Sequence, residues 1–237
     1  MRCGHSSSDR FTRLPRAPRV VAPYNSEMAE VRAQLERHTD WLVPFSKPRN
    51  QYADARQFRS TWLTASRTTL RELGYGAAYE AALDPVHREA ILGAVPGVWL
   101  PMAVARAHYE AADKLDLTES QVVAIGIAAT RRSNATMLSF MSRLAQGAGV
   151  TPWTALGYAP RLMANTSDGG AIAVARMGPK DAILELVGYP LASVRYNRIA
   201  SRGIALGIIE LFCKSAYAKQ IDALTSAHTL GIRMAWV

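Results

Sequence analysis

The feature that most constrains this chain is a strict alternation of apolar and other residues close to its C-terminus. The apolar positions are Leu230, Ile232, Met234 and Trp236, with Gly231, Arg233 and Ala235 between them. Successive side chains of a β-strand point to opposite faces of a sheet, so this period predicts a strand with one buried face. Such a strand needs partner strands and a covering layer.

The segments before it supply both. Residues 170–177 and 182–188 read as strands joined by the turn sequence Gly178-Pro179-Lys180-Asp181. Residues 192–215 return to helical spacing. The C-terminal strand pairs with a strand at about 218–227.

The resulting order is strand, strand, helix, strand, strand. It predicts a four-stranded, largely antiparallel sheet in residues 169–237, backed by the 192–215 helix. In that helix Gly203 and Gly207 fall on one apolar face, four residues apart. Since glycine weakens a helix interior by about 1 kcal/mol, this pair indicates close packing against the sheet or another helix.

The region 26–168 has helical patterning, so the fold class is α+β, with 26–237 as one compact unit. Helices are expected at about 26–42, 54–73, 76–83, 84–96, 98–115 and 118–147, and a short one begins at Thr151-Pro152. Asp84-Pro85 is a cap followed by proline at the first helical position. Thr118 and Gln121 have the spacing of a capping box. The apolar run Val122–Ala129 predicts burial on every side.

Residues 1–25 are expected to form a disordered basic arm. Five arginines stand there against the single acid Asp9, with little apolar patterning, in a chain whose formal net charge is +9. The arm lacks the apolar core of a secretory signal. Its composition resembles a transit peptide, and a start at Met28 is an alternative.

The sequence carries no recognised catalytic or metal-binding motif. Cys3 and Cys213 are too few for a disulfide scaffold, and they fit a reducing, cytoplasmic setting. The five histidines lack zinc-ligand spacing, and no nucleophile elbow or phosphate loop is present. No apolar run is long enough to predict a membrane span. We therefore expect a non-enzymatic protein without a metal.

Two groups of residues are candidates for binding. Arg195, Arg198 and Arg202 recur on one helix face and could hold an anion, although a solvated face is the plainer interpretation. The other group consists of aromatic residues beside apolar helix faces, which are expected near a ligand pocket: Trp99, His108, Tyr109, Phe140 and Tyr196. His108 is also read as a hydrogen-bonded boundary histidine.

Several stretches resemble a bacterial family of unknown function associated with 4-vinyl-reductase and haem-NO-binding-like domains. They are Gly170–Val174, Met177–Ala182, Arg202-Gly203, Trp99-Leu100-Pro101 and the helix 118–149, within residues 60–237. The resemblance implies helices packed on an antiparallel sheet, with a cavity for small apolar molecules or haem.

Haem itself is not expected, so no cofactor is assigned. The family's Tyr-x-Ser-x-Arg motif has no match at the right spacing near Tyr196 and Arg202, and His108 is the one tempting axial ligand.

Three functional hypotheses follow. The first is a ligand-sensing, regulatory or scaffolding domain that takes a small apolar molecule or a protein partner, with a pocket between helices and sheet. Its ligand would act by stabilising one packing of the long helix. The second is a nucleic-acid-associated protein that uses the arm and the three arginines. The third is a structural subunit, or a homodimer that associates through the Gly203/Gly207 face.

Overall fold

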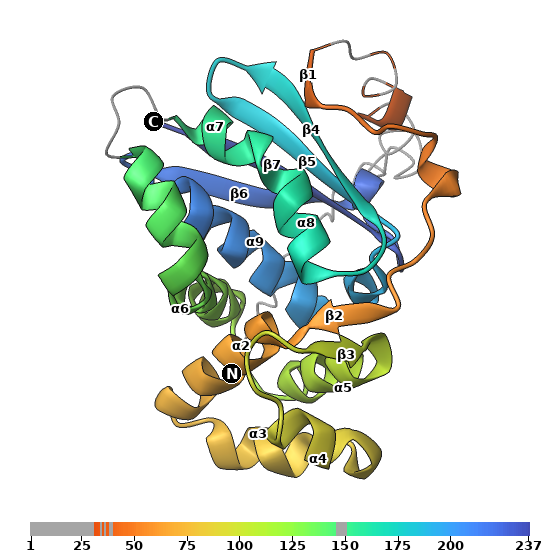
Figure 1. Ribbon diagram of the computed structural model, residues 1–237, viewed down its shortest axis with the longest axis vertical. Helices are drawn as coiled ribbons and strands as arrows, with labels where there is room; N and C mark the ends of the chain where they lie inside the picture. Colours follow the sequence, from red (N-terminus) through yellow and green to blue (C-terminus); the bar gives the residue numbers. More distant parts are fainter. Residues whose placement is uncertain (1–30, 34, 36, 38–39, 146–150) are drawn as a thin grey trace, which may run out of the picture.

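The fold is a five-stranded sheet with helices on one face and a helical layer at one end (Figure 1). The computed structural model describes residues 31–33, 35, 37, 40–145 and 151–237, without the side chains of 133–145. The expected arm, and most of the expected 26–42 helix, lie outside this range.

The described helices follow one another along the chain. They are α2 (Ser60–Glu72), α3 (Gly76–Ala82), α4 (Pro85–Leu92), α5 (Met102–Asp113), α6 (Glu119–Ala145), α7 (Pro152–Gly157), α8 (Ala159–Thr166) and α9 (Arg195–Ile209). Two expected helix starts are confirmed in detail. The Asp84 carboxylate accepts a hydrogen bond from the Val86 N–H at 2.9 Å, and the Thr118 N–H donates to Gln121 Oε1 at 2.8 Å.

The predicted strand-strand-helix-strand-strand order is confirmed. The sheet strands are β1 (Trp41–Val43), β4 (Ala171–Gly178), β5 (Asp181–Val187), β6 (Ala216–Ile221) and β7 (Thr229–Trp236). They run antiparallel in the order β1-β4-β5-β7-β6. The alternation near the C-terminus holds, because Leu230, Ile232, Met234 and Trp236 are all buried.

The structure corrects three sequence-based boundaries. Trp41–Val43 does not end a helix but adds β1 to the sheet edge beside β4, so the sheet has five strands. The starts of the expected 54–73 and 98–115 helices instead form a two-stranded ladder, β2 (Gln57–Arg59) with β3 (Trp99–Pro101). These three-residue strands have no periodicity of their own, since their pairing partners lie far away in the sequence.

The later helix and strand are also shorter than expected. α9 stops at Ile209 rather than near residue 215. Beyond it the chain turns, and the Lys214 N–H donates to the Val237 carbonyl at 3.1 Å. The strand β6 then runs from Ala216 to Ile221, where a strand at about 218–227 was expected. In α6 the expected burial on every side is wrong, since Ala124 is exposed.

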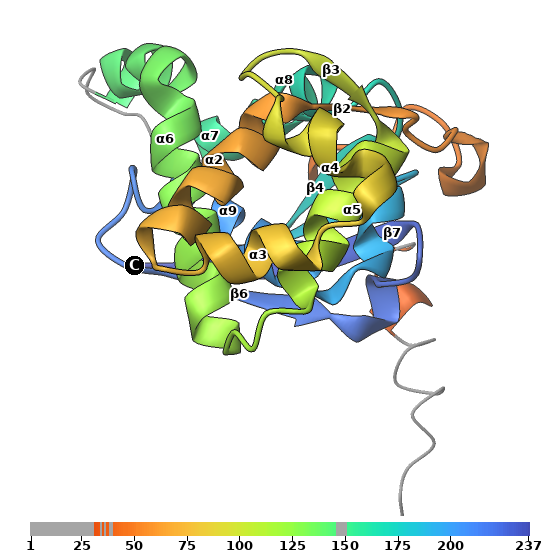
Figure 2. The same ribbon diagram turned by 90° about the horizontal axis from the view of Figure 1, so that it is seen from below.

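The layers are arranged around α9. Helices α7, α8 and α9 lie against the sheet in Figure 1, and α6 crosses α9. Helices α2–α5 form a further layer beneath them, as the view from below shows (Figure 2). The largest group of contacting buried apolar residues joins this layer to the inner face of the sheet through α9.

Glycines permit the crossing of α6 and α9. A Cβ on Gly126 would overlap the Ala200 carbonyl oxygen, and a Cβ on Gly203 would overlap the Val123 carbonyl oxygen. Gly207 lies against Thr130. The prediction of close helix packing is therefore confirmed. A homodimer through the Gly203/Gly207 face is not available, because α6 of the same chain covers that face.

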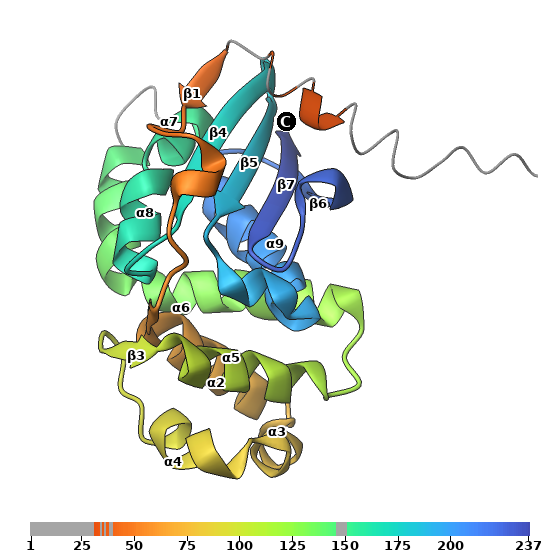
Figure 3. The ribbon, with the colours of Figure 1, turned by 90° about the vertical axis from the view of Figure 1, so that its right-hand side faces the viewer.

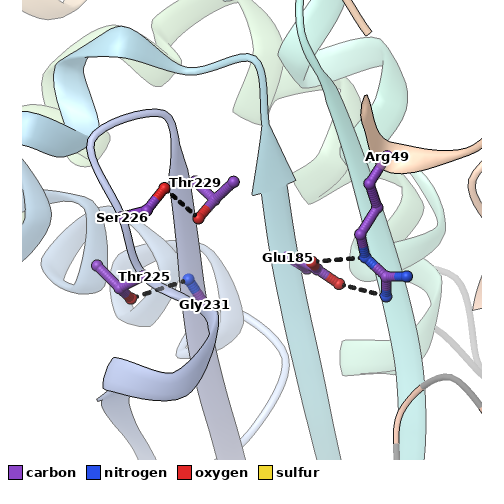
Figure 4. A network of polar contacts seen from close by, with 6 residues as sticks. All are labelled: Arg49, Glu185, Thr225, Ser226, Thr229 and Gly231. Atoms are coloured by element: carbon purple, nitrogen blue, oxygen red, sulfur yellow. Dashed lines mark hydrogen bonds and ion pairs between the residues drawn. The ribbon is translucent and has the colours of Figure 1, made fainter. Parts of the chain in front are cut away.

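The outer face of the sheet carries a buried carboxylate. Glu185 on β5 is 2% exposed. Arg49 binds it with two hydrogen bonds of 2.8 Å, as Figure 4 shows. Arg49 belongs to the strap, residues 44–56, which runs from β1 along the sheet to β2 (Figure 3). The pair therefore fastens the strap to the sheet.

Alanine at either crossing glycine should destabilise the fold. We expect Gly126→Ala and Gly203→Ala each to lower the free energy of unfolding by about 2 kcal/mol or more, because backbone atoms cannot move aside as side chains do. Urea denaturation measures this. Gly157→Ala is the control, since a Cβ there meets nothing within 4 Å. Equal stability of all three variants would contradict the close crossing.

Removing Arg49 should cost more than removing the whole ion pair. Arg49→Met leaves the Glu185 charge buried without its partner, and we expect unfolding to become easier by about 3 kcal/mol. The double variant Arg49→Met/Glu185→Leu should recover most of that loss. A double variant no more stable than the single one, again in urea, would show that the pair does not anchor the strap.

Candidate functional site

A cavity of about 100 Å³, partly open to solvent, lies between the sheet, α8 and α9. It is bounded by side chains from both halves of the chain. Its lining consists of Phe58, Trp62, Tyr109, Leu162, Met163, Thr166, Ile172, Leu184, Leu186, Tyr189, Ser201, Ile204, Ala205, Ile208 and Ile232. No charged side chain belongs to this set, so the cavity suits an uncharged, apolar molecule.

Local structure places these side chains. Leu184 and Leu186 are two residues apart on β5 and so point to the same face of the sheet. Ile204 and Ile208 are four residues apart on α9 and share one side of the helix. On α2, the Trp62 ring is oriented by its Nε1–H, which donates to Thr166 Oγ1 on α8 at 3.1 Å.

The cavity lining includes two buried tyrosines, Tyr109 and Tyr189. Burial raises the pKa of Tyr109 well above its usual value, with Tyr189 and Tyr196 adding to the effect. Burial likewise raises the pKa of Tyr189, and this effect outweighs the hydrogen bonds with Asn197 and Ser201, which lower it. Both phenols therefore stay protonated at neutral pH, and they add no charge to the lining.

His108 is a buried structural residue. It is fully buried, and its Nδ1 lies 2.6 Å from the Tyr79 hydroxyl. Burial lowers the pKa of His108 to about 3, with the Arg67 charge adding to the effect. Burial also raises the pKa of Tyr79, so Tyr79 donates to Nδ1 of a neutral imidazole. Nε2 then carries the proton, and it has no hydrogen-bond partner among the described residues.

The structure separates the five aromatic candidates. Of the four whose side chains the structure describes, Tyr109 alone lines the cavity. Tyr196 packs behind it, with ring centroids 6.2 Å apart and its hydroxyl 3.3 Å from Ser66 Oγ. His108 lies next to Tyr109 but faces Tyr79.

The remaining two candidates lie elsewhere. Trp99 does not line this cavity; it is 36% exposed on β3, with the Arg59 guanidinium 4.1 Å from its ring centroid. The side chain of Phe140 lies outside the described residues.

The three arginines of α9 share a face, as their spacing indicates, but each contacts a neighbour within the chain. Arg195 lies 3.6 Å from Asp113. Arg198 donates to the carbonyls of Ala192 and Ser193, and Arg202 pairs with Glu119. They fasten α9 to the elements around it, which argues against the anion-binding role.

Most of the cavity lining was not singled out by the sequence. Phe58 and Trp62 are four residues apart and Leu184 alternates with Leu186, so periodicity marks them as buried. Nothing in the pattern distinguishes a residue beside a void from one in a filled core, because that depends on how well distant elements fit together.

The described residues contain no group of three or more His, Cys, Asp or Glu side chains that could hold a metal ion. Within the same part of the chain, no helix is long and apolar enough to cross a lipid bilayer.

Comparison with known proteins identifies the fold. No protein-family model and no curated protein matches the sequence. A structure solved to probe haem distortion in the H-NOX family aligns with a TM-score of 0.50 and 14% identity, over 75% of this chain and 94% of that chain. An oxygen-binding H-NOX domain related to soluble guanylate cyclases aligns with a TM-score of 0.49 and 13% identity, over 75% and 92%.

The first of these alignments shows that the chain has an H-NOX-like fold. The haem-NO-binding side of the sequence resemblance is supported, and the 4-vinyl-reductase side is not. The likeness also contradicts the prediction from the sequence that the protein has no cofactor and does not bind haem. The finding that contradicts this expectation is the first of these alignments, whose structure was solved to probe the distortion of haem in its own family.

The cavity in its present form does not fit haem. A cavity of about 100 Å³ is smaller than an engineered one of ~150 Å³ that holds a single benzene, and a porphyrin is several times larger than benzene. Among the described residues, the lining includes no histidine or cysteine. Its possible axial ligands are Met163, whose sulfur lies 3.6 Å from Ser167 Oγ, and two protonated tyrosines.

The buried His108 should make stability depend on pH. Its folded-state pKa of about 3 lies below the unfolded value near 6.5, so its contribution is complete above about pH 6.5 and is lost as the pH falls toward 3. We expect a loss of about 1.4 kcal/mol per pH unit from this group. In His108→Gln, urea unfolding at pH 6.5 and 4.5 should show a correspondingly weaker dependence. The same slope in both proteins would contradict a neutral buried imidazole.

Proposed function

We propose that this protein is a non-enzymatic small-molecule sensor whose ligand occupies the cavity between the helices and the sheet. The observation that carries the proposal is the position of the cavity. Its lining joins the helical layer to the sheet, through Tyr109 on α5, Leu162 on α8, Ile204 on α9 and Leu184 on β5. An occupant of the cavity would therefore lie between the helices and the sheet.

The size and chemistry of the lining define the ligand class. An apolar cavity of about 100 Å³ suits a molecule of a few heavy atoms, since a slightly larger apolar cavity binds xenon or benzene. The likeness to a domain studied for the distortion of its haem supports a sensing role. The neutral lining supports a role without catalysis, because it offers no charged acid or base.

The ligand would act by population shift. Packing on both sides of the cavity is close, and a bound molecule stabilises the arrangement of α8 and α9 that encloses it. The shift can be no larger than the difference in ligand affinity between the two arrangements. α6 contacts α9 at the glycine crossing, so a displacement of α9 reaches α6 directly.

Filling the cavity should abolish binding. Benzene should stabilise the wild-type protein by about 2.7 kcal/mol at a hundred times its dissociation constant. Ala205→Leu places extra side-chain volume inside the cavity and should remove this stabilisation. Calorimetry and thermal unfolding measure both effects. Ala124→Leu makes the same change on the exposed side of α6 and should bind as the wild type does.

Two results would count against the proposal. The first is an absence of benzene or xenon binding to the wild-type protein. The second is equal binding by Ala205→Leu. Incubation with haemin is the parallel measurement. A stoichiometric Soret band that Ala205→Leu suppresses would show that the cavity widens to bind haem. In that case haem, and not a small apolar molecule, would be the ligand in this proposal.

A further inference from the structure

A second space, the outer pocket, lies on the other face of the sheet. Its volume is about 700 Å³, and it is open to solvent. Its lining comes from Arg32, the strap, the end of β5 and the loop that leads into β7. Glu185 and Val187 line it, and they alternate along β5 with Leu184 and Leu186, which line the cavity. The two spaces therefore lie on opposite faces of one strand.

The floor of the outer pocket contains a buried carboxylate. The Glu185 side chain is 3% exposed, and Arg49 of the strap reaches it from one side (Figure 4). The residues level with Glu185 on the neighbouring strands are Ala173 and Gly231, whose side chains are too short to reach over the carboxylate. Glu185 thus borders an open space, where a longer cross-strand neighbour would have covered it.

The charges of the lining are largely cancelled within the chain. Arg49 binds Glu185 through two hydrogen bonds. His228 Nδ1 lies 2.8 Å from Asp54 Oδ2, which joins the loop to the strap. Arg32 stands outside these two pairs, and it is exposed, so salt screens its charge. An ion of either sign would meet a group of its own sign beside each group that attracts it, which disfavours a charged ligand.

The lining keeps hydrogen-bonding capacity beyond these pairs. A carboxylate has about four lone-pair sites, and Arg49 donates two hydrogen bonds to Glu185. The hydroxyls of Ser226 and Thr229 lie 2.8 Å apart, and one shared hydrogen bond does not exhaust either of them. The lining also includes the exposed amide of Asn50. Donors and acceptors are therefore mixed, as a ligand hydroxyl requires, because it both donates and accepts.

The lining also has an apolar part. The Tyr52 hydroxyl accepts hydrogen bonds from the N–H groups of Ser46 and Lys47, at 2.9 and 3.2 Å, so this residue adds chiefly its ring to the pocket. Val187 adds a second apolar side chain. A ligand for this lining would combine hydroxyl groups with a carbon framework.

We propose that the outer pocket binds a small, uncharged molecule rich in hydroxyl groups, of about the size of a monosaccharide. Pockets of about 300 to 1,000 Å³ are usual for ligand sites, and this one lies in that range. The hydroxyls bind the remaining sites of Glu185, Asn50, Ser226 and Thr229 without separating either internal ion pair. The site is independent of the cavity, so the two proposals succeed or fail separately.

The test is an NMR titration of the full chain with D-glucose and myo-inositol, two rings that differ in hydroxyl arrangement. We expect saturable shifts of the backbone amides of Glu185, Gly188 and Thr229 with at least one of them. Inorganic phosphate and glycine are the charged comparison probes. Arg32→Ala should leave the affinity for the polyol within about twofold, because a rim charge adds little for an uncharged ligand.

Two matched strap variants locate the site. Asn50→Trp places a large ring in the pocket and should weaken polyol binding by about tenfold or more. Gln51→Trp makes the same change at the next exposed residue, which does not line the pocket, and should bind as the wild type does. The proposal is overturned if neither polyol gives saturable shifts at these amides, if Asn50→Trp and Gln51→Trp bind equally well, or if phosphate or glycine binds there in place of the polyols.

Discussion

The structure depends on the backbone-to-backbone contact of α6 with α9. Gly126 and Gly203 meet where any side chain would strike a carbonyl group. This contact lets one side of α9 lie flat on α6 while the opposite side covers the sheet. Ile204 and Ile208 then face the interior space, and the hydrophobic area they bury stabilises both interfaces at once. With a wider crossing, α9 could not serve both layers, and the cavity between them would have a different shape.

The pleat of the sheet divides β5 between two environments. Leu184 and Leu186 enter the apolar cavity, and Glu185 between them meets Arg49 on the outer face. A carboxylate at this depth is tolerable only with a charged, hydrogen-bonded partner. The strap supplies that partner. One face of the strand thus borders the cavity, and the other holds the strap.

The secondary structure of the C-terminal region could be predicted closely, because period and turn chemistry are local. The short strands β1, β2 and β3 could not, since three residues have no measurable period and acquire their conformation from partners distant in the sequence. In the candidate site, Tyr109 was found as an aromatic beside an apolar stripe. Trp99 had the same pattern, but it lies on the surface under Arg59. Periodicity identifies a face, and only the neighbours decide whether that face borders a core, a cavity or solvent.

By itself, the sequence determined an α+β chain whose last third forms an antiparallel sheet with a helix between two strand pairs. It also determined that the Gly203/Gly207 side of that helix must pack closely. The tertiary structure decided which helix fills that side, that the α9 arginines bind neighbours within the chain, and where the cavity lies. The physical reason is that a strand pattern follows from the chemistry of adjacent residues. A void, by contrast, is the mismatch that remains when several separately specified surfaces are brought together.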